Sequence, residues 1–432
     1  MRLGGRLAAA VEVLDDVAKR HRPVADALKD WGLSHRFAGS GDRSAIGNLV
    51  YDALRRRRSF GWRMGNDSPR ALVFAALAEG YGMAADAVAA ALEGDRFAPK
   101  LPSAADFERF RTVDLAKAPD AVRADVPDWL ADEFAISLGP EWIAEAAAFA
   151  ERPPLDLRVN ALLGNREEAA AKLAEFGAAA TRLSPLGLRI PPIAGAGRHP
   201  NVQAEAVFQM GTVEVQDEGS QLVSLLVGAK AGETILDFCA GAGGKTLALA
   251  AATAGERRIH AFDADRRRLA PIYERLRRAR AESVEVHSRT GELEALEGAC
   301  DRVLVDAPCT GSGTWRRRPD AKWRLSRSAL EKRTAEQDAV LDSAARFVRP
   351  GGGRLAYVTC SVLASENGAR VEAFLARHPD FAVEDAGAVW REELSDVPPD
   401  FLNVPGGGGS GLLLTARRSG TDGFFFARLV RR

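Results

Sequence analysis

The stretch TILDFCAGAGGKT, residues 234–246, decides the fold of this chain. It begins as a short apolar run that ends in Asp237, a pattern typical of a buried parallel strand. The chain then turns through Gly241, Gly243 and Gly244 and enters a helical pattern rich in alanine and leucine at 245–252. Glycine lets a backbone approach a ligand closely, and a helix N-terminus attracts anionic or polar groups. The stretch therefore predicts the first strand, turn and helix of a nucleotide-binding type of fold.

Two familiar glycine motifs resemble this turn, and neither fits it. A phosphate-binding P-loop needs glycine five residues before the Gly-Lys-Thr, where this chain has Cys239. A dinucleotide fingerprint needs a third glycine where this chain has Thr246. Both ATP or GTP and NAD are therefore disfavoured as ligands.

Strand and helix patterns alternate around this stretch. Strand patterns lie at 234–237, 258–263, 284–287, 302–306 and 354–359. Helical patterns follow at 245–252, 266–280, 330–348 and 365–377, and a terminal hairpin is expected from 412–415 and 423–430. Such alternation predicts a parallel sheet with right-handed crossovers. We expect this Rossmann-like α/β domain to span 213–432.

Two other parts precede this domain. Residues 1–125 carry helical patterns throughout and predict an all-helical bundle. Residues 126–212 combine helices with short strands at 155–161 and 186–190 and predict a small α+β unit. A run of four arginines, 55–58, ends one helix of the bundle; it is either a solvated helix end or a phosphate-contacting patch.

Composition sets broad limits on the class of protein. The chain has 432 residues, with 46% apolar and 27% charged residues, which is typical of a globular protein of two or three domains. Basic and acidic residues balance at 59 each, so net charge neither suggests nor excludes a nucleic-acid partner. No signal peptide and no apolar run long enough to span a membrane are evident. We therefore expect a cytoplasmic protein with no membrane partner and with reduced thiols.

Polar and reactive residues follow the predicted strands at the edge where a doubly wound sheet binds ligands. Asp263 ends the second strand, where an acidic residue commonly accepts hydrogen bonds from a ribose diol. Asp306 ends the fourth strand, Cys309 lies three residues later, and Cys360 follows the fifth strand. If the first, fourth and fifth strands are neighbours, the two thiols face one cleft beside the glycine turn.

The four cysteines fall into two groups by their sequence surroundings. Cys239 and Cys300 fit a structural role as buried thiols. Cys309 and Cys360 lie in turn segments beyond the apolar runs that would bury them, which favours a functional role. The sequence does not predict a metal site, because it has no Cys-x-x-Cys and no histidines close enough in sequence to form a ligand pair. A redox dithiol would leave the ribose site unexplained.

Five motifs resemble the Nop/Sun family of RNA cytosine-5 methyltransferases. DFCAGAGGKT, DAPCTGSGTWRRRPDAKW and YVTCSVLASEN carry the resemblance, and VQDEGSQL at 215–222 and the closing DGFFFARL also match the family pattern. RPPLDLRVN resembles the RNA-binding extension that precedes the catalytic domain of this family. DRSAIGNLVYDALRRRRSF resembles the NusB-like domain of its bacterial 16S ribosomal RNA members.

The resemblance implies a site for S-adenosylmethionine over the glycine turn. The cofactor-binding residues that it implies are Cys239, Ala240, Gly241, Ala242, Gly243, Gly244, Lys245, Asp263 and Asp306. Asp263 would hold the ribose, and Asp306 would contact the methionine end of the cofactor or the target cytosine. The family usually has proline where this chain has Ala242, and the adenosine contact after the third strand cannot be assigned to Ser288 or Arg289.

The resemblance also implies four catalytic residues: Cys360, Cys309, Asp306 and Lys245. Cys360 would attack cytosine C6 as a thiolate, and Cys309 would assist removal of the C5 proton and release of the adduct. Lys245 and Lys322 are candidates for lowering the pKa of the nucleophile. Arg316–Arg318 and Trp323 would supply charge and a stacking surface near the site, or else form a solvated loop.

We therefore expect an enzyme, acting as a monomer, that methylates cytosine C5 in RNA, foremost in 16S ribosomal RNA. Because this chemistry needs an unstacked base, the substrate would be single-stranded or loop RNA. Two alternatives remain open at this point. One is the same chemistry on transfer RNA or another RNA, and the other is a non-catalytic RNA-binding factor in ribosome assembly.

Overall fold

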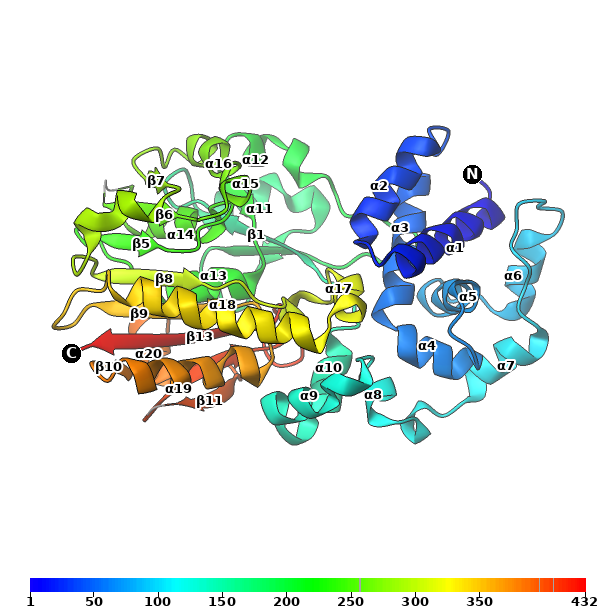
Figure 1. Cartoon of the computed structure of the whole chain (residues 1–432). Helices are drawn as coiled ribbons and strands as arrows, with labels where there is room; N and C mark the ends of the chain where they lie inside the picture. The colour runs from blue at the N-terminus through cyan, green and yellow to red at the C-terminus, as the bar shows by residue number, and fades with distance from the viewer. Residues whose placement is uncertain (256–257, 396, 407) are drawn as a thin grey trace. The chain divides into compact units, whose positions relative to one another are not determined.

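The computed structural model describes residues 1–255, 258–395, 397–406 and 408–432, and they divide into two compact units. The helical unit comprises Met1–Pro153, Pro192–His199 and Thr314–Leu325. The sheet unit comprises Pro154–Pro191, Pro200–Gly313 and Ser326–Arg432. Figure 1 shows both units coloured along the chain.

The helical unit packs its first seven helices around one apolar core. Its helices are α1 Leu3–Arg20, α2 Val24–Ser34, α3 Ser40–Arg55, α4 Arg57–Met64, α5 Pro69–Gly80, α6 Ala85–Leu92, α7 Ala104–Thr112, α8 Asp120–Arg123, α9 Ala131–Leu138, α10 Trp142–Ala148 and α17 Pro319–Arg324. Local signals explain several of these boundaries. Ser68 caps α5 by accepting from the backbone N–H of Ala71 at 3.3 Å, and Pro69 fits the first helical position.

The predicted arginine patch at 55–58 is engaged within this unit. Arg55 is buried and donates to the carbonyl oxygen of Arg316 at 2.7 Å. Arg56 pairs with Glu79, Arg57 with Asp67 at 3.5 Å, and Arg58 with Asp128 at 2.8 Å. Arg55 also pairs with Asp52 at 2.8 Å. These pairs oppose the phosphate-contacting interpretation, because an RNA phosphate would have to displace a carboxylate from each of the four guanidinium groups.

The sheet unit begins with a small four-stranded antiparallel sheet in the order β2-β3-β1-β4. Its strands are β1 Leu155–Val159, β2 Ala179–Ala180, β3 Gly187–Ile190 and β4 Val213–Val215, and its helices are α11 Arg166–Lys172 and α12 Ala206–Gln209. The segment from 213 onward was assigned by its sequence to the last domain. In the structure β4 pairs with β1, so it belongs to the small sheet.

The described residues of the last domain form a nine-stranded sheet with the order β11-β12-β13-β9-β8-β5-β6-β7, and β10 pairs with β13. The strands are β5 Ile235–Asp237, β6 Ile259–Phe262, β7 Glu285–His287, β8 Arg302–Asp306, β9 Arg354–Thr359, β10 Phe381–Val383, β11 Leu402–Gly406, β12 Gly409–Leu414 and β13 Phe424–Arg431. Strands β5 to β9 pair in parallel, as the alternation predicts. The predicted terminal hairpin is present as β12 and β13, and β13 also pairs antiparallel with β9.

Helices cover both faces of this sheet, and Figure 1 shows α18 and α19 packed together along one of them. The helices are α13 Glu218–Leu225, α14 Gly244–Ala252, α15 Arg266–Leu269, α16 Ile272–Arg278, α18 Arg327–Ala345, α19 Gly368–Arg377 and α20 Ala386–Glu393. The basic helix predicted at 266–280 is interrupted and forms α15 and α16. Pro271 lies between them and lacks the N–H that a continuous helix would use.

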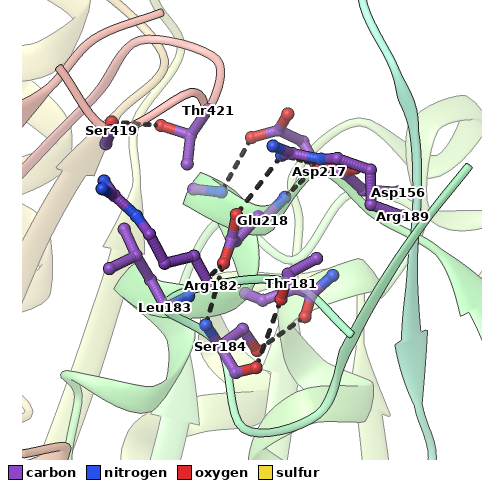
Figure 2. Close-up of polar contacts among 12 residues, drawn as sticks. Asp156, Thr181, Arg182, Leu183, Ser184, Arg189, Asp217, Glu218, Ser419 and Thr421 are labelled. Atoms are coloured by element: carbon purple, nitrogen blue, oxygen red, sulfur yellow. Dashed lines mark hydrogen bonds and ion pairs between the residues drawn. The ribbon is translucent and has the colours of Figure 1, made fainter. Parts of the chain in front are cut away.

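A buried polar network joins the small sheet to α13, and Figure 2 shows it. Glu218, fully buried at the start of α13, accepts from the backbone N–H groups of Leu183 and Ser184 at 2.7 and 2.9 Å. Arg189 of β3 donates to both carboxylate oxygens of Asp156 on β1, each at 2.7 Å, and lies 3.3 Å from Glu218. The VQDEGSQL motif therefore holds the start of α13 against the small sheet.

No single helix in the described residues is both long and apolar enough to cross a membrane, although one bent pair, α5 with α6, passes that test on length and composition.

Candidate active site

The glycine turn between β5 and α14 forms an open backbone cradle. Gly241 and Gly243 have φ angles of 51° and 83°, in the left-handed region that favours glycine. A Cβ at Gly243 would lie 2.5 Å from Cγ1 of Ile272, so a larger residue does not fit there. The carbonyl of Ala242 accepts from Nη1 of Arg275 at 2.7 Å, which holds the turn although proline is replaced by alanine.

Asp263 follows β6 and reaches back to the glycine turn. Its Oδ2 accepts from the backbone N–H of Gly241 at 3.0 Å, and its Oδ1 accepts from that of Asp265 at 2.8 Å. Oδ2 also lies 3.6 Å from Nη1 of Arg268, and each carboxylate oxygen can accept more than one hydrogen bond. The carboxylate therefore closes the turn and keeps acceptor capacity where a ribose diol is expected.

Lys245 and Asp306 form an ion pair at the same sheet edge. Nζ of Lys245 donates to Oδ2 of Asp306 at 2.6 Å and lies 5.4 Å from the ring centre of Phe424. Burial by itself lowers the pKa of Lys245, but the charge and hydrogen bond of Asp306 outweigh it and the net pKa is raised. Lys245 is therefore a cation at neutral pH.

The two candidate thiols meet at the ends of neighbouring parallel strands. The β8–β9 register places Asp306 opposite Val358, so Cys309 and Cys360 leave the sheet at one edge. Their sulfur atoms lie 3.3 Å apart, beyond the roughly 2.05 Å of a disulfide. Strands β5, β8 and β9, the first, fourth and fifth of the predicted strands, are neighbours in the sheet. The predicted cleft requires this arrangement.

The pKa of the Cys309 thiol is raised by its surroundings. The hydrogen bond with Cys360 is the largest cause that raises the pKa of Cys309 well above its usual value, and burial and the nearby charges of Cys360 and Glu366 add to it. Cys309 therefore keeps its proton at neutral pH.

A buried carboxylate that the sequence analysis missed supports the turn after β8. Glu366 accepts from the backbone N–H and the hydroxyl of Thr310 at 2.8 and 2.5 Å. Gln337 of α18 donates to Glu366 at 3.0 Å and to the carbonyl of Pro308 at 2.9 Å. The residues on either side of Cys309 are thus held from α18 and from the segment before α19.

Further hydrogen bonds join this turn to the turn that carries Cys360. The hydroxyls of Ser312 and Ser361 lie 2.9 Å apart, and the backbone N–H of Gly313 donates to the carbonyl of Cys360 at 3.0 Å. The two turns that carry the cysteines are therefore hydrogen-bonded to each other, and these bonds fix the separation of the two sulfur atoms.

Lys322 is held by the helical unit, whereas both thiols lie in the sheet unit. The segment Thr314–Leu325 belongs to the helical unit, where Nζ of Lys322 donates to the carbonyls of Arg55 and Asp125 at 2.9 and 2.6 Å. Trp323 donates to the carbonyl of Leu54 at 2.7 Å and packs against the helical core, so its ring is not a free stacking surface. Of the two candidate lysines, Lys245 is the one in the same unit as Cys360.

The other two cysteines have surroundings that suit structural thiols. Cys300 is fully buried, and burial raises its pKa to about 12. Burial and the nearby carboxylates Asp263, Asp237 and Asp306 raise the pKa of Cys239 well above its usual value. Both therefore stay protonated at neutral pH.

Asp237 lies buried beneath the glycine turn and is an unusual carboxyl group. Its Oδ2 accepts from the hydroxyl of Thr246 at 2.7 Å, while its Oδ1 has no hydrogen-bond partner among the described residues. Burial, opposed in part by the Thr246 hydrogen bond, raises its pKa to about 7. The Asp237 carboxyl therefore keeps its proton up to about pH 7 in the folded protein. In the unfolded chain it loses that proton at about pH 4.

This proton predicts a pH-dependent stability. Because the pKa is raised on folding, Asp237 lowers the free energy of unfolding progressively from about pH 4 to about pH 7. Asp237→Asn cannot ionise, so its free energy of unfolding relative to wild type should rise by about 2 kcal/mol between about pH 5 and 8. Urea unfolding at both pH values measures this, with the exposed Asp265→Asn as control. Parallel pH profiles for Asp237→Asn and wild type would show that the carboxyl titrates normally.

Two protein-family models match parts of this chain. Residues 224–430 match the family described as 16S rRNA methyltransferase RsmB/F. Residues 126–191 match the ferredoxin-like domain of RsmF/B-like methyltransferases.

Two relatives carry the name ribosomal RNA small subunit methyltransferase B. The one from Cronobacter sakazakii is 35% identical over 309 residues, covering 71% of this chain and 66% of the relative. The one from Sodalis glossinidius is 34% identical over 336 residues, covering 75% of this chain and 71% of the relative.

Solved structures agree with the fold. The crystal structure of PH0851 is 25% identical, covers 99% of both chains and has a TM-score of 0.73. The structure of NSun6 from Pyrococcus horikoshii with SFG is 19% identical, covers 71% of this chain and 98% of that one, and has a TM-score of 0.59. The predicted fold class, a Rossmann-like α/β domain preceded by helical and small α+β parts, is confirmed.

Proposed function

Because this chain belongs to the 16S rRNA methyltransferase RsmB/F family, whose methyl donor is S-adenosylmethionine, we propose that it methylates C5 of a cytosine in small-subunit ribosomal RNA. The reaction passes through a covalent bond between Cys360 and cytosine C6. The observation that carries this proposal is the thiol pair, 3.3 Å apart, at the strand edge that also holds Lys245 and Asp306.

The glycine turn and Asp263 fit the cofactor. Gly241 and Gly243 adopt the left-handed φ angles that glycine favours, and Asp263 has acceptor capacity for ribose hydroxyls. Residues Cys239–Lys245, with Asp263 and Asp306, would hold the cofactor. S-adenosylmethionine supplies an electrophilic methyl group when it is bound.

Cys360 is the nucleophile in this proposal. Cytosine C5 is a poor nucleophile until a group adds at C6, and a thiolate is the species that adds. The hydrogen bond from the Cys309 thiol and the nearby Lys245 ammonium both favour the Cys360 thiolate. When the sulfur bonds to C6, the electron pair of the C5–C6 double bond makes C5 the nucleophilic carbon that accepts the methyl group.

Cys309 is the base that completes the reaction. While Cys360 is a thiolate, its hydrogen bond and charge keep the proton on Cys309. Once the Cys360 sulfur is bonded to C6, that charge is gone, so the pKa of Cys309 falls and its proton can pass to solvent. The Cys309 thiolate then takes the C5 proton, the C5–C6 double bond re-forms, and Cys360 leaves as a thiolate.

The parts that precede the catalytic domain are proposed to hold the RNA. We assign this role to the helical part, 1–125, and to the α+β part, 126–212, and we expect the protein to act as a monomer. The ferredoxin-like match over 126–191 supports the second assignment.

Transfer of a labelled methyl group tests the proposed substrate. The protein is incubated with methyl-labelled S-adenosylmethionine and, separately, with unmethylated 16S RNA, small ribosomal subunits and transfer RNA. Digestion to nucleosides should give labelled 5-methylcytidine from the ribosomal samples. Label in transfer RNA alone would favour the other substrate class, and binding of 16S RNA without label in any sample would favour a non-catalytic assembly factor.

The ribose contact gives a separate prediction. Asp263→Ala removes a charged acceptor, so the affinity for S-adenosylmethionine should fall by roughly 1.5–3 kcal/mol, about 10- to 150-fold. Calorimetry measures this, with Asp265→Ala as control because the backbone N–H that Asp265 donates to Asp263 is retained. Equal affinities for Asp263→Ala and wild type would remove Asp263 from the cofactor site.

A further inference from the structure

Two histidines and a glutamate share one face of the large sheet at its β7 edge. The parallel register pairs His260 of β6 with Glu285 of β7 and Phe262 with His287. Residues in register, and residues two apart on one strand, point to the same face of a sheet. The fold therefore gathers three metal-ligating side chain types on one face, although 27 residues separate the two histidines in sequence.

The distances suit a shared metal ion. Nδ1 of His260 lies 3.2 Å from Nε2 of His287 and 3.5 Å from Oε2 of Glu285, and the three ligand atoms lie within 4.8 Å of one another. Two nitrogens that each lie about 2.0–2.1 Å from a tetrahedral zinc are about 3.4 Å apart. The observed spacing therefore needs little adjustment to accept an ion.

A fourth residue places a carboxylate near the other nitrogen of His287. Oε2 of Glu292 lies 3.9 Å from Nδ1 of His287 and accepts from the backbone N–H of Ser288 at 2.9 Å. A carboxylate facing Nδ1 favours the tautomer that carries hydrogen there, which leaves the Nε2 lone pair directed toward His260. This arrangement is the one that a histidine bound to metal through Nε2 requires.

Access also suits metal binding. Both histidine side chains are largely buried, at 13% and 15% exposed, while the Glu285 side chain is 58% exposed. An ion would therefore enter from the side of Glu285.

We propose that His260, Glu285 and His287 bind a divalent transition metal ion, zinc by preference, with the remaining position open to water. The set of two imidazoles and one carboxylate is one that zinc accepts. This site is separate from the thiol pair and does not depend on the proposed reaction. The backbone N–H of Asp263 approaches the carbonyl of His287 at 3.4 Å. An ion bound here would therefore stabilise the pairing of β6 with β7 next to Asp263, the proposed ribose contact.

Cobalt and zinc titration of the full chain, prepared without a polyhistidine tag, tests this proposal. Wild type should bind one cobalt ion with the weak visible bands of nitrogen and oxygen ligands, and zinc should displace it and raise the melting temperature. His260→Ala/His287→Ala should weaken cobalt binding at least 100-fold. His378→Ala is the matched control, because that imidazole faces a single carboxylate, Asp342, at 2.9 Å, and it should bind cobalt as wild type does.

Two results would overturn the proposal. One is undiminished cobalt binding by the double variant. The other is a sulfur-to-cobalt charge-transfer band, which would place the ion on Cys309 and Cys360. If the double variant does not fold, Glu285→Gln serves instead, since its side chain is exposed. It should fold and bind cobalt about tenfold more weakly, and binding equal to wild type would count against the site.

Discussion

Cys360→Ser should abolish both methyl transfer and the covalent protein–RNA adduct, with a loss of activity on the order of 10⁴-fold or more. A serine hydroxyl is far less acidic than a thiol and needs a base to attack C6. The Cys309 thiol beside this position is protonated, and the Lys245 ammonium is bound to Asp306. Neither the thiol nor the ammonium can take the hydroxyl proton.

Binding and a second cysteine provide the controls for this variant. Cys360→Ser should retain wild-type affinity for S-adenosylmethionine, so the loss cannot be attributed to an empty cofactor site. Cys300→Ala changes a fully buried thiol that the mechanism does not use and should keep wild-type activity. Methyl transfer by Cys360→Ser at more than about a hundredth of the wild-type rate would exclude this cysteine as nucleophile.

Cys309→Ser should fail in a different way and accumulate an adduct. Attack by Cys360 and methylation of C5 remain possible, but the base that removes the C5 proton is gone. Loss of a general base typically slows a step by about 10²–10⁴-fold. The RNA should therefore remain bonded to Cys360 and migrate with the protein on a denaturing gel.

One gel with both variants, RNA and cofactor distinguishes the two assignments. DNA cytosine methyltransferases use a cysteine of a Pro-Cys motif as nucleophile, and here that residue is Cys309. An adduct trapped by Cys360→Ser in place of Cys309→Ser would mean that the roles of the two thiols are exchanged.

The sequence predicted the elements whose signals are local. The apolar run to Asp237, the glycine turn and the alternation of strands and helices were sufficient for the parallel sheet. The same alternation placed Cys309 and Cys360 at one edge, because residues that follow neighbouring parallel strands leave the sheet together. Local signals were also enough for α5, which has a capping serine and a proline at its start.

Features that depend on contacts distant in sequence could not be predicted. Lys322 has the expected position in its motif, yet the segment that carries it packs into the helical unit. Glu366 reaches Thr310 across 56 residues, and no spacing rule links the two. The pairing of His260 with His287 follows from strand order, and spacing in sequence does not predict it because the two residues are 27 positions apart.

The central claim, methylation of cytosine C5 in small-subunit ribosomal RNA, is tested most directly by mapping 5-methylcytosine across total RNA from cells with and without the gene. The account predicts that one or more sites in 16S ribosomal RNA lose the modification when the gene is absent. Those sites should regain it when the wild-type gene is returned but not when the Cys360→Ser gene is returned. An unchanged 16S map, or loss confined to transfer RNA, would contradict it.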